Sequence, residues 1–175
     1  MINKIFKPSV NVSFEFYVCC GNEYGGTGAD GITIGINKKE LFYDIRKWSY
    51  ITYSGRKVYY YGYVYRGGSA SLVGGYFKYY VMIDEFKNKG DPDSEIIKIG
   101  DTNSMLAYVH RDFLGTGLHN MSVIITSHYI KVYYDNELAL TQNVVLPDRI
   151  VLSIGLGTRS GTNVHAIRNL RISYF

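Results

Sequence analysis

A strict alternation of apolar and polar residues near the N-terminus constrains the fold of this chain most. From Val10 to Val18 every second residue is apolar, and asparagine, serine, glutamate and tyrosine lie between them. Ile32, Ile34 and Ile36 repeat the alternation. Because successive side chains of a β-strand point to opposite faces, each segment predicts a strand with one buried face.

Similar patterns predict strands along most of the chain. The further predicted strands cover residues 49–53, 58–65, 77–84, 95–99, 104–109, 119–126, 129–135, 149–155 and 166–174. Residues 119–135 form a predicted hairpin that turns near Ser127 and His128. Only Lys38 to Lys47 has helical spacing, and we expect a single helix turn there. Short, evenly spaced strands and 19 glycines favour an all-β sandwich or jelly roll.

Length and composition exclude several classes of protein. The 175 residues predict one domain, residues 1–175. No run approaches the roughly 20 apolar residues that cross a bilayer, so we expect no direct membrane insertion. Residues 1–10 have no apolar stretch of the signal-peptide type, so we expect no signal peptide within them. The net charge is only +4 and no nucleic-acid-binding motif accompanies the scattered basic residues, so we expect no nucleic-acid partner. The two cysteines, Cys19 and Cys20, are adjacent on a predicted strand and therefore unlike a metal or redox pair.

Residues 83–93 form an acidic stretch after a predicted buried strand. Side-chain oxygens come from Asp84, Asn88, Asp91 and Asp93, and glycine and proline turn the backbone among them. Converging carboxylates repel one another unless a cation joins them, and calcium takes six to eight oxygen ligands. The same residue types also form ordinary solvated turns. The stretch alone leaves a calcium site and an acidic turn both open.

Three segments, in this order, resemble the legume-type (L-type) lectins and their bacterial and archaeal relatives. Residues 26–36, Gly-Thr-Gly-Ala-Asp-Gly-Ile-Thr-Ile-Gly-Ile, resemble the family's Ala-Asp-Gly loop and the apolar strand after it. Residues 81–93 resemble its metal-binding strand and loop, and residues 153–167 resemble its Gly-rich sugar-specificity loop and following strand. The resemblance implies a concanavalin A-like jelly-roll β-sandwich of two antiparallel sheets. It also implies a domain that binds glycans or glycoconjugates and is not an enzyme.

The resemblance implies a role for each matching residue. Asp30 would accept hydrogen bonds from sugar hydroxyls, and Asn88 would bind calcium through its oxygen and donate its NH₂ to the sugar. The implied sugar-binding residues are Asp30, Gly75 (or Gly74), Asn88, Gly161 and Thr162. The implied ligands of one Ca²⁺ are Asp84, the Phe86 carbonyl, Asn88 and Asp91.

Three departures from the family pattern shape the expectations. Met82 replaces a glutamate ligand, and Ile96 or Ile97 replaces a histidine, so we expect no transition-metal site. The loop is one residue shorter than in the plant members, which leaves Asp93 as an alternative to Asp91. The family's usual N-terminal strands have no counterpart before residue 10. We therefore expect a fragment of a larger protein, or a fold completed by another chain or by a homo-oligomer through its sheet edges.

Two other functions remain as alternatives. A β-glucan hydrolase of the same jelly roll needs paired carboxylates, but Asp84 and Glu85 are adjacent and would point to opposite faces of a strand. A structural or adhesive module of a cell-surface layer, appendage or virion would share the fold without binding sugar. Either a lectin or an adhesive module is expected outside the cell or at its surface.

Overall fold

The computed structural model describes residues 4–19, 31–38, 44–51, 57–64, 77–87, 91–113, 115–157 and 164–175. These residues form 13 strands and no helix, so none of them belongs to a helix that could cross a membrane. The strands are β1 (Lys4–Phe6), β2 (Ser9–Cys19), β3 (Gly31–Lys38), β4 (Asp44–Ile51), β5 (Lys57–Val64), β6 (Tyr79–Asp84), β7 (Ile96–Asp101), β8 (Met105–His110), β9 (His119–Thr126), β10 (Tyr129–Tyr134), β11 (Glu137–Asn143), β12 (Ile150–Gly157) and β13 (Val164–Tyr174).

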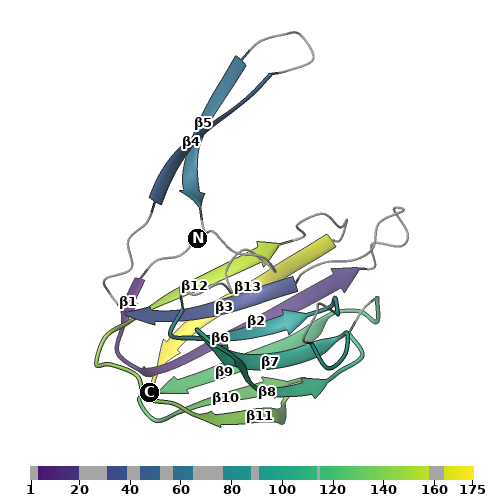
Figure 1. The fold of residues 1–175 in the computed structure, drawn as a ribbon. Coiled ribbons are helices and arrows are strands. Elements are labelled where there is room, and N and C mark those ends of the chain that lie inside the picture. The colour runs from purple at the N-terminus through teal and green to yellow at the C-terminus, as the bar shows by residue number, and fades with distance from the viewer. Residues whose placement is uncertain are drawn as a thin grey trace.

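Two antiparallel sheets form a β-sandwich (Figure 1). One sheet has the order β1-β12-β3-β6-β7-β8 and the other has the order β11-β10-β9-β2-β13. Strands β4 and β5 pair only with each other in the sheet order, and their hairpin extends away from the sandwich (Figure 1). The predicted all-β jelly-roll sandwich is confirmed.

The alternating residues of the sequence form the core between the sheets. On β2 the apolar residues from Val10 to Val18 are at most 3% exposed, and on β3 the three isoleucines are at most 2% exposed. They pack with Val81 and Ile83 of β6 and with apolar residues of β7, β9, β10 and β12. Burial of one face of each strand explains why a period of two appears in the sequence.

The predicted helix turn at Lys38–Lys47 is wrong where the structure describes it. Lys38 ends β3, and residues 44–47 lie in β4, paired with β5 from Asp44 opposite Val64 to Ile51 opposite Lys57. Residues 39–43 lie outside the described residues. A ladder of eight cross-strand pairs outweighs the weak helical spacing of a few apolar side chains.

The hairpin of β9 and β10 is confirmed, and the sequence missed the strand that follows it. Asp135 and Asn136 both have positive φ, 48° and 69°, and they turn β10 into β11. Two such residues in a row are typical of the turn that joins neighbouring antiparallel strands. The Asp-Asn pair was therefore the sequence signal for β11.

Asp135 gives a first testable prediction, because it ties this turn to β9. Its Oδ1 accepts a hydrogen bond from the Asn120 backbone N–H at 2.8 Å, and its Oδ2 lies 2.8 Å from His119 Nδ1. Burial acts to raise the pKa of Asp135, but the hydrogen bonds from Asn120 and His119 outweigh it and leave the pKa lowered. A lowered pKa means that the ionised carboxylate stabilises the folded state above the unfolded-state pKa, and that this contribution disappears as pH falls through the folded-state pKa.

Asp135→Asn, which keeps the tolerance for positive φ, should therefore lower the free energy of unfolding by about 1 kcal/mol at pH 7. This value is at the low end for a charged acceptor, because 41% of the Asp135 side chain is exposed. Urea unfolding should show the difference shrinking below the ordinary aspartate pKa of about 4. An equal difference at pH 7 and pH 3 would contradict the electrostatic origin.

Candidate functional site

Three strand ends that adjoin the sequence-predicted loops lie side by side at one end of the six-stranded sheet. Strand β3 begins at Gly31, which pairs with Asp84 at the end of β6 and with Gly157 at the end of β12. Asp30 directly precedes Gly31, the acidic stretch directly follows Asp84, and the Gly-rich segment 158–163 directly follows Gly157. The strand register therefore brings the described parts of the three segments of the lectin resemblance side by side at this end of the sheet.

The structure describes some of the predicted site residues. Asp84, Phe86 and Asp91 are described, whereas Asp30, Gly74, Gly75, Asn88, Gly161 and Thr162 lie outside the described residues. Phe77, two residues after Gly75, lies before the start of β6, at the end of that strand opposite to Asp84. The roles of the residues outside the described ranges remain predictions.

Asp84 and Asp91 are joined by a lysine that the sequence analysis did not single out. Lys98 Nζ of β7 donates to Asp84 Oδ2 at 2.5 Å and to Asp91 Oδ1 at 2.8 Å. The side chains of Lys98, Asp84 and Asp91 are only 7%, 0% and 11% exposed. The other oxygen of Asp84, Oδ1, accepts the Phe86 backbone N–H at 3.2 Å. An ammonium group thus bridges the two carboxylates predicted to bind calcium.

The register of β6 and β7 explains how Lys98 reaches Asp84. Tyr80, Met82 and Asp84 alternate along β6 with the core residues Val81 and Ile83, so they lie on the sheet face away from the core. Lys98 pairs with Met82. It is therefore the diagonal neighbour of Asp84 on that face, within reach of a long side chain.

The charges of this cluster are strongly coupled. Burial raises the pKa of Asp84 to about 6, although Lys98 opposes the shift. Burial acts to lower the pKa of Lys98, but Asp84 and Asp91 outweigh it and the pKa is raised. Lys98 is therefore protonated at neutral pH, and it neutralises one of the two carboxylate charges.

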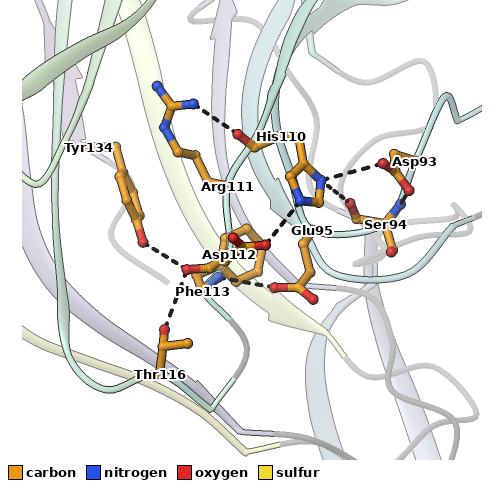
Figure 2. Close-up of polar contacts among 9 residues, drawn as sticks. All are labelled: Asp93, Ser94, Glu95, His110, Arg111, Asp112, Phe113, Thr116 and Tyr134. Carbon is orange, nitrogen blue, oxygen red and sulfur yellow. Dashed lines mark hydrogen bonds and ion pairs between the residues drawn. The ribbon is translucent and has the colours of Figure 1, made fainter.

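Asp93, the alternative ligand, faces a different partner. Its Oδ2 lies 3.5 Å from His110 Nδ1, and its Oδ1 accepts the Ser94 backbone N–H at 2.8 Å (Figure 2). His110 also contacts Asp112 Oδ1 at 3.1 Å through Nε2. The structure thus brings Asp91, and not Asp93, together with Asp84.

The end of the acidic stretch is also tied to the segment that follows β8. Glu95, at a φ of 53°, accepts the Arg111 backbone N–H through its carbonyl at 2.9 Å. Its carboxylate accepts the Phe113 backbone N–H at 3.0 Å (Figure 2). These bonds and those of Asp93 tie residues 93–95 to the end of β8 and to the segment after it.

Glu85 points away from Asp84, as the alternation of a strand predicts. The Glu85 carboxylate contacts His165 Nε2, and the two side chains are 1% and 3% exposed. His165 belongs to β13 of the other sheet. The pair therefore connects the two sheets directly beside the candidate site, and Glu85 is not a second carboxylate facing Asp84.

The described residues fit calcium better than a transition metal. Among them no three His, Cys, Asp or Glu side chains group as a metal site. The Asp84 and Asp91 carboxylates and the Phe86 carbonyl are hard oxygen donors of the kind that calcium prefers. Lys98 Nζ already binds one oxygen of each carboxylate, and Asp84 Oδ1 accepts the Phe86 backbone N–H. Met82 and Ile96, both fully buried, stand beside them and offer no ligand that a divalent transition metal binds well.

A separate polar hollow lies on the other sheet. It has a volume of about 290 Å³ and is lined by Ser13, Phe14, Glu15, Asn120, Met121, Ser122, Tyr133, Asn136, Asn169 and Arg171. These residues come from β2, β9, β10, β13 and the turn after β10. None of them is a residue that the sequence predicted for sugar or metal binding.

Solved structures with a similar fold include two lectin domains. The exoplasmic/lumenal domain of VIP36 in its Ca²⁺/Man-bound form superposes with a TM-score of 0.65 at 15% identity, covering 99% of this chain and 70% of that one. Winged bean acidic lectin complexed with methyl-α-D-galactose superposes with a TM-score of 0.64 at 14% identity, covering 94% of this chain and 73% of that one. The chain has the fold of the L-type lectins.

A third neighbour with this general fold is the carbohydrate-binding module CBM66 from Bacillus subtilis. Its TM-score is 0.53 at 10% identity, with 97% of this chain and 76% of that chain covered. No protein-family model matches the sequence, and no curated protein matches it significantly. The sequence identities to these neighbours are only 15%, 14% and 10%, so the similarity to lectins rests on the fold alone.

Proposed function

We propose that this chain is a non-catalytic carbohydrate-binding domain with a shallow sugar site at the start of β3 and the ends of β6 and β12. The observation that carries the proposal is the pairing of Gly31 with both Asp84 and Gly157. Asp30 directly precedes Gly31, the acidic stretch begins at the end of β6, and the Gly-rich loop directly follows Gly157, so this pairing supports one shared site for three segments that are far apart in the sequence. Structural neighbours that are lectins and a carbohydrate-binding module support the same role.

Each proposed residue has a defined task at the sugar. A sugar ring presents neighbouring hydroxyls that both donate and accept, so the site needs a fixed acceptor and a fixed donor. Asp30 is the acceptor and the Asn88 amide is the donor. Gly161 and Thr162 would set the preference among sugars. The resemblance also gives Gly75 a backbone N–H that reaches the sugar, but Gly75 lies only two residues before Phe77, at the end of β6 opposite to Asp84, so we leave it out of this site. The exposed Phe86 ring, at 38%, can cover an apolar sugar face.

We further propose one calcium ion at this site. Asp84, the Phe86 carbonyl, Asn88 and Asp91 would hold it, without a transition-metal neighbour. The ion would supply charge that fixes the Asn88 amide in one orientation, which lowers the ordering cost of sugar binding. The VIP36 domain, whose structures include Ca²⁺-bound forms, is a neighbour that supports this assignment.

The expected partners and location follow from this role. Glycans or glycoconjugates are the proposed ligands, outside the cell or on the secretory side, where the exoplasmic/lumenal domain of VIP36 is found. Among the described strands, β1, β8, β11 and β13 lie at sheet edges. They are where a further segment, or a second copy of the chain, would add to the sandwich.

Asp30→Ala should abolish binding while leaving the fold intact. Loss of a charged acceptor that takes hydrogen bonds from the sugar should weaken binding at least about 100-fold. A glycan array identifies the ligand, and titration calorimetry on the best glycan then compares the variant with the wild type. Circular dichroism and thermal unfolding should match the wild type, because the substitution removes no apolar side chain.

The matched control is Arg171→Ala, which alters the polar hollow on the other sheet. We expect it to leave glycan affinity unchanged. Wild-type glycan affinity in Asp30→Ala, or loss of glycan affinity in Arg171→Ala, would mean that the sugar site does not lie at the start of β3. An array without any bound glycan would instead favour the structural or adhesive module. Binding that survives EDTA unchanged would contradict the calcium part alone.

A further inference from the structure

Lys98 is an unusual residue for its position. It is the only charged residue of the run Ile96-Ile97-Lys98-Ile99, and its side chain is 7% exposed. Lysine is almost never this buried unless its ammonium group is paired. Here it is paired twice, with Asp84 at 2.5 Å and Asp91 at 2.8 Å. The pairing joins β7, the end of β6 and the middle of the acidic stretch.

Asp84 and Asp91 need a positive charge between them whether or not calcium is bound. Asp84 is fully buried, and the Asp91 side chain is 11% exposed. Two buried carboxylates that share one partner repel each other strongly when no positive charge lies between them. Because Lys98 contributes its charge through a covalently attached side chain, that charge is present before any metal arrives.

We propose that Lys98 is a built-in cation that holds Asp84 and Asp91 together, so that this end of the sheet folds without metal and calcium is left to organise only the sugar-facing side. Lys98 is thus a positioning residue for the proposed site. The part of this inference that concerns calcium rests on the calcium site proposed above. The part that concerns folding without metal rests on the contacts of Lys98 alone.

Two consequences follow from the charges. Removal of Lys98 takes away the ammonium group that joins Asp84 to Asp91, so the metal-free protein loses stability. The same removal takes a positive charge away from beside the calcium position. Repulsion between that positive charge and Ca²⁺ weakens calcium binding by more than about tenfold, even at an effective dielectric constant of about 20. The variant should therefore bind calcium more tightly and depend on it.

The test compares Lys98→Met with the wild type by thermal unfolding in EDTA and in excess Ca²⁺. The wild-type protein should be folded in EDTA, and Ca²⁺ should raise its midpoint only by the modest amount that its weaker binding gives. The Lys98→Met midpoint in EDTA should fall by roughly 10 °C, and Ca²⁺ should restore most of that loss. Calorimetric titration with Ca²⁺ should give an affinity at least about tenfold tighter for the variant. No sugar is needed, so a failed glycan array does not affect these readings.

Lys131→Met is the matched control, since Lys131 is also a strand lysine but lies over the Tyr129 ring on β10 of the other sheet. The thermal midpoint of Lys131→Met in EDTA, and its rise with Ca²⁺, should equal those of the wild type. If Lys98→Met fails to fold in EDTA, the double variant Lys98→Met/Asp84→Asn, which removes the opposing charge, should fold and ignore Ca²⁺.

Three results would overturn the proposal. One is wild-type protein that unfolds in EDTA, because folding would then depend on metal. Another is a Lys98→Met midpoint equal to the wild type in EDTA. The third is a destabilised Lys98→Met that Ca²⁺ does not rescue, since Lys98 would then serve as a structural ion pair only.

Discussion

Gly31→Ala is expected to lower the free energy of unfolding by roughly 4 kcal/mol or more, a loss at the severe end for a single substitution. A Cβ at this position would lie 1.8 Å from the Ile83 carbonyl oxygen and 2.9 Å from its carbon. Both atoms belong to the backbone of β6, so no side-chain rotation relieves the overlap. The φ of +136° is a second obstacle, because residues with a Cβ rarely adopt it.

Gly117→Ala separates the two obstacles. Gly117 has a similar φ of +124°, but nothing lies within 4 Å of the Cβ that alanine would add. It should lose only the strain of the backbone conformation, about 1–2 kcal/mol. Denaturant unfolding of both variants gives the comparison. Equal losses would mean that β3 can move away from β6, and that the close approach beside Asp84 is not required.

Asp84→Ala should be nearly as damaging, and it should also abolish calcium binding. Removing one partner of a buried charge pair typically costs roughly 3–5 kcal/mol, because the other partner stays buried and poorly compensated. Lys98 would keep only Asp91, and the Phe86 backbone N–H would lose its acceptor. For a domain of this length the thermal midpoint should fall by roughly 10 °C.

Asp93→Ala is the control for Asp84→Ala. The Asp93 side chain is 55% exposed and faces His110, itself 47% exposed. Exposed pairs of this kind contribute at most about 1 kcal/mol. Calcium titration should therefore fail for Asp84→Ala and succeed for Asp93→Ala. Loss of calcium binding in Asp93→Ala, with binding kept in Asp84→Ala, would make Asp93 the calcium ligand. Asp91 would then only pair with Lys98.

The sequence predicted the parts of the fold that depend on local pattern. Strands β2 and β3 alternate strictly because each buries one face, and the β9–β10 hairpin has a short turn between two such strands. The helix turn before Lys47 was wrong because the pairing of β4 with β5 decides that segment. Strand β11 was missed because its apolar side chains are only half-buried or exposed, so its alternation is weak.

The candidate site was predicted in its loops but not in its charges. Lys98 reaches Asp84 only because the register places it opposite Met82, and neither strand reveals that register alone. His165 and Glu85 lie 80 positions apart, and their contact depends on how the two sheets stack. Interactions of this kind follow from the packed sandwich and have no local sequence pattern.

The pairing of β2 with β13 has a consequence for the order in which the domain folds. Residues 9–19 meet β9 on one side, but on the other they meet residues 164–174, which the ribosome makes last in this sequence. Contacts between such distant segments form late and slowly. During synthesis β2 therefore carries an open edge until β13 emerges. For that time the unpaired N–H and C=O groups of β2 are open to pairing with another chain.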